Sequence, residues 1–233
     1  MIRKGKRGIV IVAPLVLLVI GCWDGPKQAR KELWEFGIRW NQQTFLESVE
    51  DSDAVIVELF LRAGMNPDMT NEWGWTPLMH AALAGHTGVA RSLMAAGAAV
   101  NTKGEGGLTA LSLAAGVGQT EVVKLLLGAA AEVNITDAEG WTALMYASER
   151  GYADVVKALA ERHADIDARN KEGRTALNLA ESQGHTEVVD ILRQAGASGG
   201  DVPHKTRLRA WAPDFASPPQ GGFQAQPMGP GSA

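Results

Sequence analysis

A repeat of 33 residues constrains this chain more than any other feature of its sequence. Glycine recurs at Gly74, Gly107, Gly140 and Gly173, a threonine follows each of them two residues later, and a leucine follows each threonine two residues after that. Alanine, a second glycine, valine and a second leucine continue in the same phase from Ala81, Gly85, Val89 and Leu93. A unit of this size cannot bury its own apolar face, so the period predicts a solenoid whose neighbouring units share one core.

Each repeat is predicted to hold two short helices. Thr76 and its counterparts stand where a helix N-cap belongs, and Pro77 then occupies the first helical position, where its missing N–H costs nothing. Gly85 and its counterparts are expected to end this helix in the left-handed region. Thr120-Glu121 opens a second helix, whose apolar stripe comprises Val122, Val123, Leu126 and Leu127.

At these residues the chain resembles the ankyrin repeat, since GWTPLMHAALAGHTGVARSLMAAGAAVN is close to the consensus of that family. The resemblance covers about residues 41–197 and implies an all-α ankyrin-repeat solenoid, made of helix-turn-helix pairs joined by β-hairpin loops. It places a degenerate repeat at 41–70 and four clear repeats at 71–103, 104–136, 137–169 and 170–197. Ala130 and His163 stand where the second helix usually ends in glycine, so the second and third clear repeats are expected to be locally softer.

The segments that flank the repeats have other patterns. Residues 27–40 contain Leu33, Trp34, Phe36 and Ile38, and are predicted to form a short helix, ended by Gly37, that caps the first repeat. Residues 198–233 are rich in proline and glycine and are predicted to be a disordered tail.

The N-terminus has the features of an export signal. Residues 1–7 are basic, and the apolar run 9–20 spans only about 18 Å as a helix, short of a ~30 Å hydrocarbon core. Val19-Ile20-Gly21-Cys22 resembles the lipobox of bacterial lipoproteins. This resemblance implies a signal peptide at 1–21, lipid on Cys22 and an anchored linker at 22–26. An ordinary signal peptide, a short membrane anchor or a cytoplasmic protein with a misinterpreted N-terminus are the alternatives.

Localisation and partner class follow from these terminal residues and from the charge. The lipobox implies the bacterial cell envelope, and Trp23 after the cysteine favours the periplasmic face of the outer membrane over the inner membrane. Net charge is −4 overall and becomes −8 without residues 1–21, where Lys+Arg falls from 22 to 18 against 26 acidic residues. An acidic body disfavours nucleic acid as a partner. A single cysteine allows neither an intramolecular disulfide nor a cysteine-based zinc site.

The sequence predicts a non-catalytic binding protein without a cofactor or metal. No catalytic motif is present, and carboxylates such as Glu149 are expected to form a solvated surface. The ankyrin resemblance implies that a protein partner contacts the hairpin tips and the concave face. The residues that correspond to those positions, and that are predicted to bind, are Trp73, Trp75, Leu83, Leu108, Val117, Trp141, Arg150 and Arg174.

Several roles stay open at this stage. An inhibitor or immunity protein, an escort for another envelope protein, and an assembly factor fit equally well. A passive structural lipoprotein is a second class, and an enzyme with an unrecognised site is a third. Any of the three tryptophans could instead pack against a neighbouring hairpin.

Overall fold

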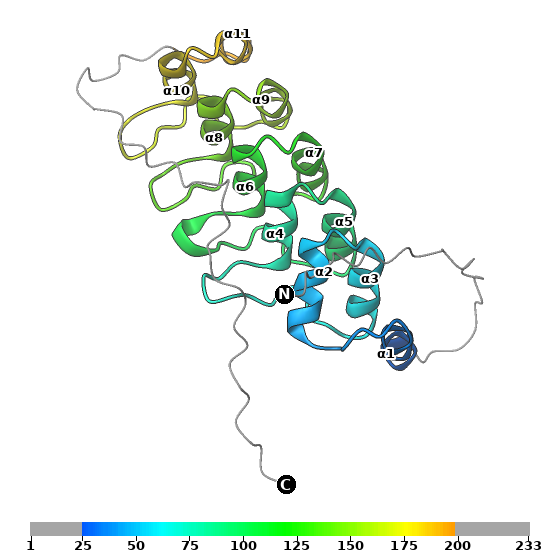
Figure 1. Ribbon diagram of the computed structural model, residues 1–233. Helices are drawn as coiled ribbons and strands as arrows, with labels where there is room; N and C mark the ends of the chain where they lie inside the picture. The colour runs from blue at the N-terminus through cyan, green and yellow to red at the C-terminus, as the bar shows by residue number, and fades with distance from the viewer. Residues whose placement is uncertain (1–24, 199–233) are drawn as a thin grey trace, which may run out of the picture.

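The computed structural model describes residues 25–198, which form a row of helical hairpins (Figure 1). The predicted signal peptide at 1–21, the predicted lipid site at Cys22 and all of the tail predicted at 198–233 except Ser198 lie outside the described residues. The first helices of the repeats are α2 (Gln42–Glu50), α4 (Pro77–Ala84), α6 (Ala110–Gly116), α8 (Ala143–Arg150) and α10 (Ala176–Gln183). The second helices are α3 (Ala54–Arg62), α5 (Thr87–Ala95), α7 (Thr120–Gly128), α9 (Ala153–Ala160) and α11 (Thr186–Gln194).

These helices form two layers, so the predicted all-helical solenoid is confirmed. Successive first helices pack side by side from α2 to α10, and successive second helices do the same in the other layer from α3 to α11. The layers can approach closely because small side chains lie between them: Ala81, Ala114, Ala147 and Ala180 are all fully buried. Apolar residues of both layers join one continuous core from α1 to α11.

Helix starts and stops follow the predicted chemistry. The side chains of Thr76, Thr109, Thr142 and Thr175 each accept a hydrogen bond from the backbone N–H three residues later, as N-caps. Gly85, Gly118, Gly151 and Gly184 all have φ between 75° and 78°, the left-handed conformation predicted for the end of the first helix. Ala130 and His163 also adopt positive φ, at 59° and 60°, although both carry a Cβ.

The connections between repeats are tighter than β-hairpins. No β-strand is present within residues 25–198; instead each connection is a turn closed by two backbone hydrogen bonds, such as Asn71 N to Trp75 O at 3.1 Å and Gly74 N to Asn71 O at 3.0 Å. In the 104–108 connection this turn is a short 3₁₀ helix, η1 (Glu105–Gly107). Successive turns are also bonded to each other, as when Glu105 N donates to Trp73 O at 2.9 Å.

Helix α1 (Gly25–Glu35) lies beyond the first repeat and packs on α3 (Figure 1). Gly37 follows it with φ of 73°. Of the apolar residues from which this helix was predicted, Leu33 is fully buried, whereas Trp34 is 77% exposed. The helix therefore covers the end of the solenoid with one narrow side only.

Candidate protein-binding surface

The predicted binding residues occupy two regions of each repeat, namely the turn before the first helix and the C-terminal end of that helix. Trp75, Leu108, Trp141 and Arg174 are equivalent residues at the end of successive turns, each 33 positions from the next. Leu83, Val117 and Arg150 lie at the ends of α4, α6 and α8. The two regions share a surface in the last repeat, because the Arg174 guanidinium in the turn donates to Ser182 Oγ on α10 at 2.9 Å.

The prediction that Trp75 and Leu108 are exposed binding residues is wrong. Their side chains are only 7% and 8% exposed, and both belong to the core. Trp75 lies over the next turn, where Gly104 replaces the Asn or Asp found at the equivalent positions of the other repeats; a Cβ on Gly104 would come within 2.9 Å of the indole. The missing side chain at Gly104 thus makes room for Trp75. Leu108, at the equivalent position one repeat later, is a smaller apolar side chain that the core also encloses.

Six predicted residues remain accessible, and we call them the strip. They are all partly exposed, and they run along the row of turns and first helices: Trp73, Leu83, Val117, Trp141, Arg150 and Arg174. The first three are apolar and belong to the first two clear repeats, whereas both arginines belong to the last two. A surface that combines half-buried tryptophan and arginine has the composition of a protein-binding site.

Trp141, a member of the strip, packs against a second aromatic side chain. Its ring lies against Tyr146 of α8, with centroids 5.0 Å apart and planes inclined by 33°. Tyr146 is itself buried, and its hydroxyl donates to the Asp137 carboxylate. Burial, followed by the hydrogen bond with Asp137, raises the pKa of Tyr146 far above its ordinary value, so the hydroxyl stays a donor. A side chain held in this way loses little conformational entropy when a partner binds.

Asp137 organises the turn as well as the tyrosine. Its Oδ1 accepts hydrogen bonds from the backbone N–H groups of Glu139 and Trp141, each at 2.8 Å. Asn71 and Asn170 bond their own turns in the same way. These residues were not predicted, although Asn71, Asp137 and Asn170 recur in the 33-residue phase and could have been found from it.

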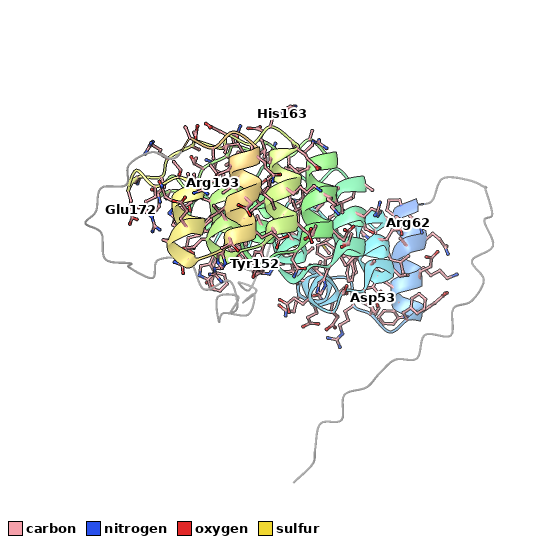
Figure 2. All side chains as sticks on the ribbon, turned by 90° about the horizontal axis from the view of Figure 1, so that it is seen from above. Asp53, Arg62, Tyr152, His163, Glu172 and Arg193 are labelled. Carbon is pink, nitrogen blue, oxygen red and sulfur yellow. The ribbon has the colours of Figure 1, made fainter. Side chains whose placement is uncertain are left out.

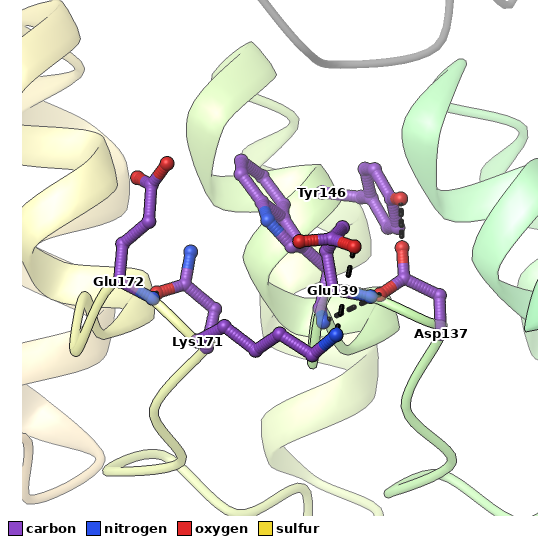
Figure 3. Close-up of polar contacts among 7 residues, drawn as sticks. Asp137, Glu139, Tyr146, Lys171 and Glu172 are labelled. Atoms are coloured by element: carbon purple, nitrogen blue, oxygen red, sulfur yellow. Dashed lines mark hydrogen bonds and ion pairs between the residues drawn. The ribbon is translucent and has the colours of Figure 1, made fainter. Parts of the chain in front are cut away.

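The C-terminal half of the strip is charged. Lys171 Nζ lies 3.6 Å from Glu139 Oε1 across adjacent turns (Figure 3). Glu149, at the end of α8, is half-buried, and its Oε2 is shielded from water without a hydrogen-bond partner among the described residues. Burial raises the pKa of Glu149, while Arg150 and Arg174 oppose that rise. The expectation that this carboxylate is simply solvated was therefore wrong.

Other sites of chemistry are not apparent in the described part of the chain. Residues 25–198 contain no cluster of three or more histidine, cysteine or acidic side chains that could hold a metal ion. No helix in that range is long and apolar enough to cross a membrane. His86 and His185 follow the helix-ending glycines, and each ring Nε2 lies within 3.0 Å of a carbonyl of the preceding repeat, so both have structural roles.

Comparison with known proteins agrees with this architecture. A family model described as ankyrin repeats in three copies matches residues 46–137 and 118–202, more than half of the chain. No curated protein matches the chain.

Proposed function

The chain belongs to the ankyrin-repeat family, and we propose that it is a membrane-tethered binding protein whose strip holds one envelope protein. Ankyrin repeats are protein-interaction modules and are generally non-catalytic. The observation that carries the choice of surface is that the partly exposed Trp141 packs on the buried Tyr146 of α8, the helix that also carries Glu149, whose Oε2 has no hydrogen-bond partner among the described residues.

The strip favours a partner with a mixed surface. Trp73, Leu83 and Val117 would bury apolar area, which contributes roughly 25 cal/mol per Å² before the costs of association. Glu149 would accept a hydrogen bond from an amide or a basic side chain of the partner, and Arg150 and Arg174 would contact acidic or carbonyl groups. Inhibition, escort and assembly are all compatible with such binding.

Tethering rests on the N-terminal residues alone. The run of apolar residues 9–20 and the lipobox-like Val19-Ile20-Gly21-Cys22 support a lipid on the Cys22 sulfur, with outer-membrane anchoring favoured by Trp23. In a bacterial host, replacing Cys22 with Ser should release the protein from membranes, and globomycin should block its processing. Unchanged fractionation of Cys22→Ser would remove the lipoprotein part of the proposal and leave the binding part standing.

The binding part is tested by comparative capture from crosslinked envelope extracts. Trp141→Ala combined with Arg174→Ala should reduce recovery of a specific partner at least tenfold, because loss of an interface tryptophan or arginine typically costs ~2 kcal/mol or more. Glu187→Ala, on exposed α11 away from the strip, is the matched control and should retain capture. If the double variant keeps its helical circular dichroism and captures the same partners as wild type, the strip is not the binding surface.

A further inference from the structure

The large exposed apolar side chains of this protein gather at its N-terminal end and not on the strip. Among the described residues they are Trp34, Phe36, Trp40 and Val55, and three of the four lie within seven residues of one another. Their exposed fractions are 77%, 48%, 40% and 65%. Aromatic side chains left in water at one place indicate a surface that something else covers.

The segment that carries these aromatics is also the basic part of the described chain. We call residues 25–40 the cap segment. It holds four basic residues (Lys27, Arg30, Lys31 and Arg39) against two acidic ones (Glu32 and Glu35), a net charge of +2. Residues 41–198 hold 11 basic against 21 acidic residues, a net charge of −10. The exposed aromatics therefore coincide with a reversal of charge along the solenoid.

The local structure explains why the cap segment leaves its aromatics outside. Helix α1 packs on α3 through Ala29 and Leu33, which are fully buried, so Trp34 lies off that contact. Gly37 then reverses the chain, and the Arg30 guanidinium lies 4.1 Å from the centre of the Trp40 ring. In Figure 2, α1 stands at the end of the row with side chains projecting away from the repeats.

We propose that the cap segment docks on an anionic lipid surface, with Trp34, Phe36 and Trp40 in the interfacial layer and the basic side chains on the headgroups. Tryptophan is favoured at the boundary between headgroups and hydrocarbon, and arginine and lysine can bury their stems there while their charges stay in water. An anionic surface attracts a segment of charge +2 and repels a body of charge −10, which orients the solenoid away from the membrane.

This inference extends the proposed tethering, because the cap segment begins three residues after Cys22. A lipid on that cysteine would hold the start of α1 within about 11 Å of the headgroups, since three extended residues span at most about 3.6 Å each. Docking would then fix the height and tilt of the repeats, which a lipid anchor alone leaves free. The strip would face the periplasm, open to a protein partner.

The test uses the full chain with Cys22→Ser, which carries no lipid, so that its outcome does not depend on lipidation. A single cysteine introduced by Phe36→Cys is labelled with an environment-sensitive fluorophore, which replaces one apolar ring with another. Gln194→Cys, at an exposed residue of α11 at the other end of the solenoid, is the matched control position. Both labelled chains share residues 1–21, so any binding through the apolar run is common to them.

Vesicles of phosphatidylcholine with phosphatidylglycerol should shift the emission at position 36 to the blue and leave position 194 unchanged. The shift should weaken at high salt, because the Debye length falls from about 10 Å at 0.1 M to about 3 Å at 1 M. It should disappear when Trp34→Ser and Trp40→Ser are added. No shift at position 36 with anionic vesicles, an equal shift with pure phosphatidylcholine, or a shift that survives Trp34→Ser and Trp40→Ser would each overturn the proposal.

Discussion

Single positions in the turns determine which side chains the solenoid exposes. At the first position of each turn, a side-chain oxygen accepts backbone hydrogen bonds from its own turn in Asn71, Asp137 and Asn170. Gly104 stands at the same position without a side chain, and Trp75 occupies the space beside it. One repeat therefore buries its tryptophan while another presents Trp141, although both residues stand at the same position of the period.

Gly104→Ala should destabilise the protein, because the new Cβ would meet Trp75 Cδ1 at 2.9 Å and Met79 Sδ at 3.2 Å. Overpacking of this kind typically costs about 1–3 kcal/mol, measured as the free energy of unfolding by chemical denaturation. Gly128→Ala, at the end of α7 with no atom within 4 Å of its added Cβ, is the control and should be neutral or stabilising by up to about 1 kcal/mol. Equal stability of the two variants would show that Trp75 does not depend on the space at Gly104.

His80 should make stability fall as the pH falls. Burial lowers the pKa of His80 from 6.5 to about 4. Above pH 6.5 the imidazole is neutral in both states; between pH 6.5 and about 4 only the unfolded chain takes up the proton, so the free energy of unfolding decreases across this window. The loss approaches ~3 kcal/mol at its lower end.

His80→Leu should flatten this pH dependence, because leucine occupies the equivalent positions Leu113 and Leu179 without titrating. Glu50 and Glu149 have raised pKa values and act with the opposite sign, so the difference between wild type and variant is the quantity to measure by denaturation at several pH values. A difference that stays constant from pH 7 to about 4 would contradict the role given to His80.

The stability of the helices in this protein depends more on their capping residues and packing than on their length. With seven to nine residues in each helix of the repeats, isolated formation in water would be marginal, so threonine caps, left-handed glycines and packing against neighbours supply the stability. At the outer end, Arg193 of α11 pairs with Glu181 of α10 at 2.9 Å, which places charges where no further repeat follows within the described residues.

Ala130→Gly and His163→Gly should each stabilise the protein, because both residues have φ near 60° and glycine adopts that region freely. The expected gain is about 0.5–1 kcal/mol after the larger chain entropy of glycine in the unfolded state is subtracted. Ala96→Gly, at a residue with φ of −82°, is the matched control and should destabilise. Native-state hydrogen exchange should be fastest in the two repeats whose second helices are followed by Ala130 and His163. Slowest exchange there would refute the prediction that these repeats are locally less stable.

Across the whole molecule, the stability of each repeat depends on its interfaces with the adjacent repeats, because it contacts only those. Leu33→Ala should therefore cost about 2–4 kcal/mol of local stability, since Leu33 is fully buried between α1 and α3. Hydrogen exchange should accelerate in α1 to α3 and stay unchanged in α9 to α11. Trp34→Ala, at a side chain 77% exposed, should alter neither region, which separates the aromatics of the cap segment from the fold. Uniform acceleration along the chain would show a single cooperative unit instead.

The 33-residue period, read with helix-capping chemistry, determined the fold class and the ends of most helices. The roles of residues such as Thr76, Gly85 and Val122 can be predicted from the sequence. Helix caps, left-handed positions and apolar stripes depend on neighbours only a few residues away. Even the left-handed Ala130 and His163 follow from that local register.

Only the tertiary structure decided which of the tryptophans are accessible. Trp75 and Trp141 share one position of the repeat, and their exposure depends on residues about 30 positions away that the stacking brings beside them, Gly104 in the first case. The exposure of Trp34 likewise depends on how α1 tilts onto α3. Packing between repeats sums many weak contacts over distant residues, so a local pattern can indicate a surface position but cannot establish what covers it.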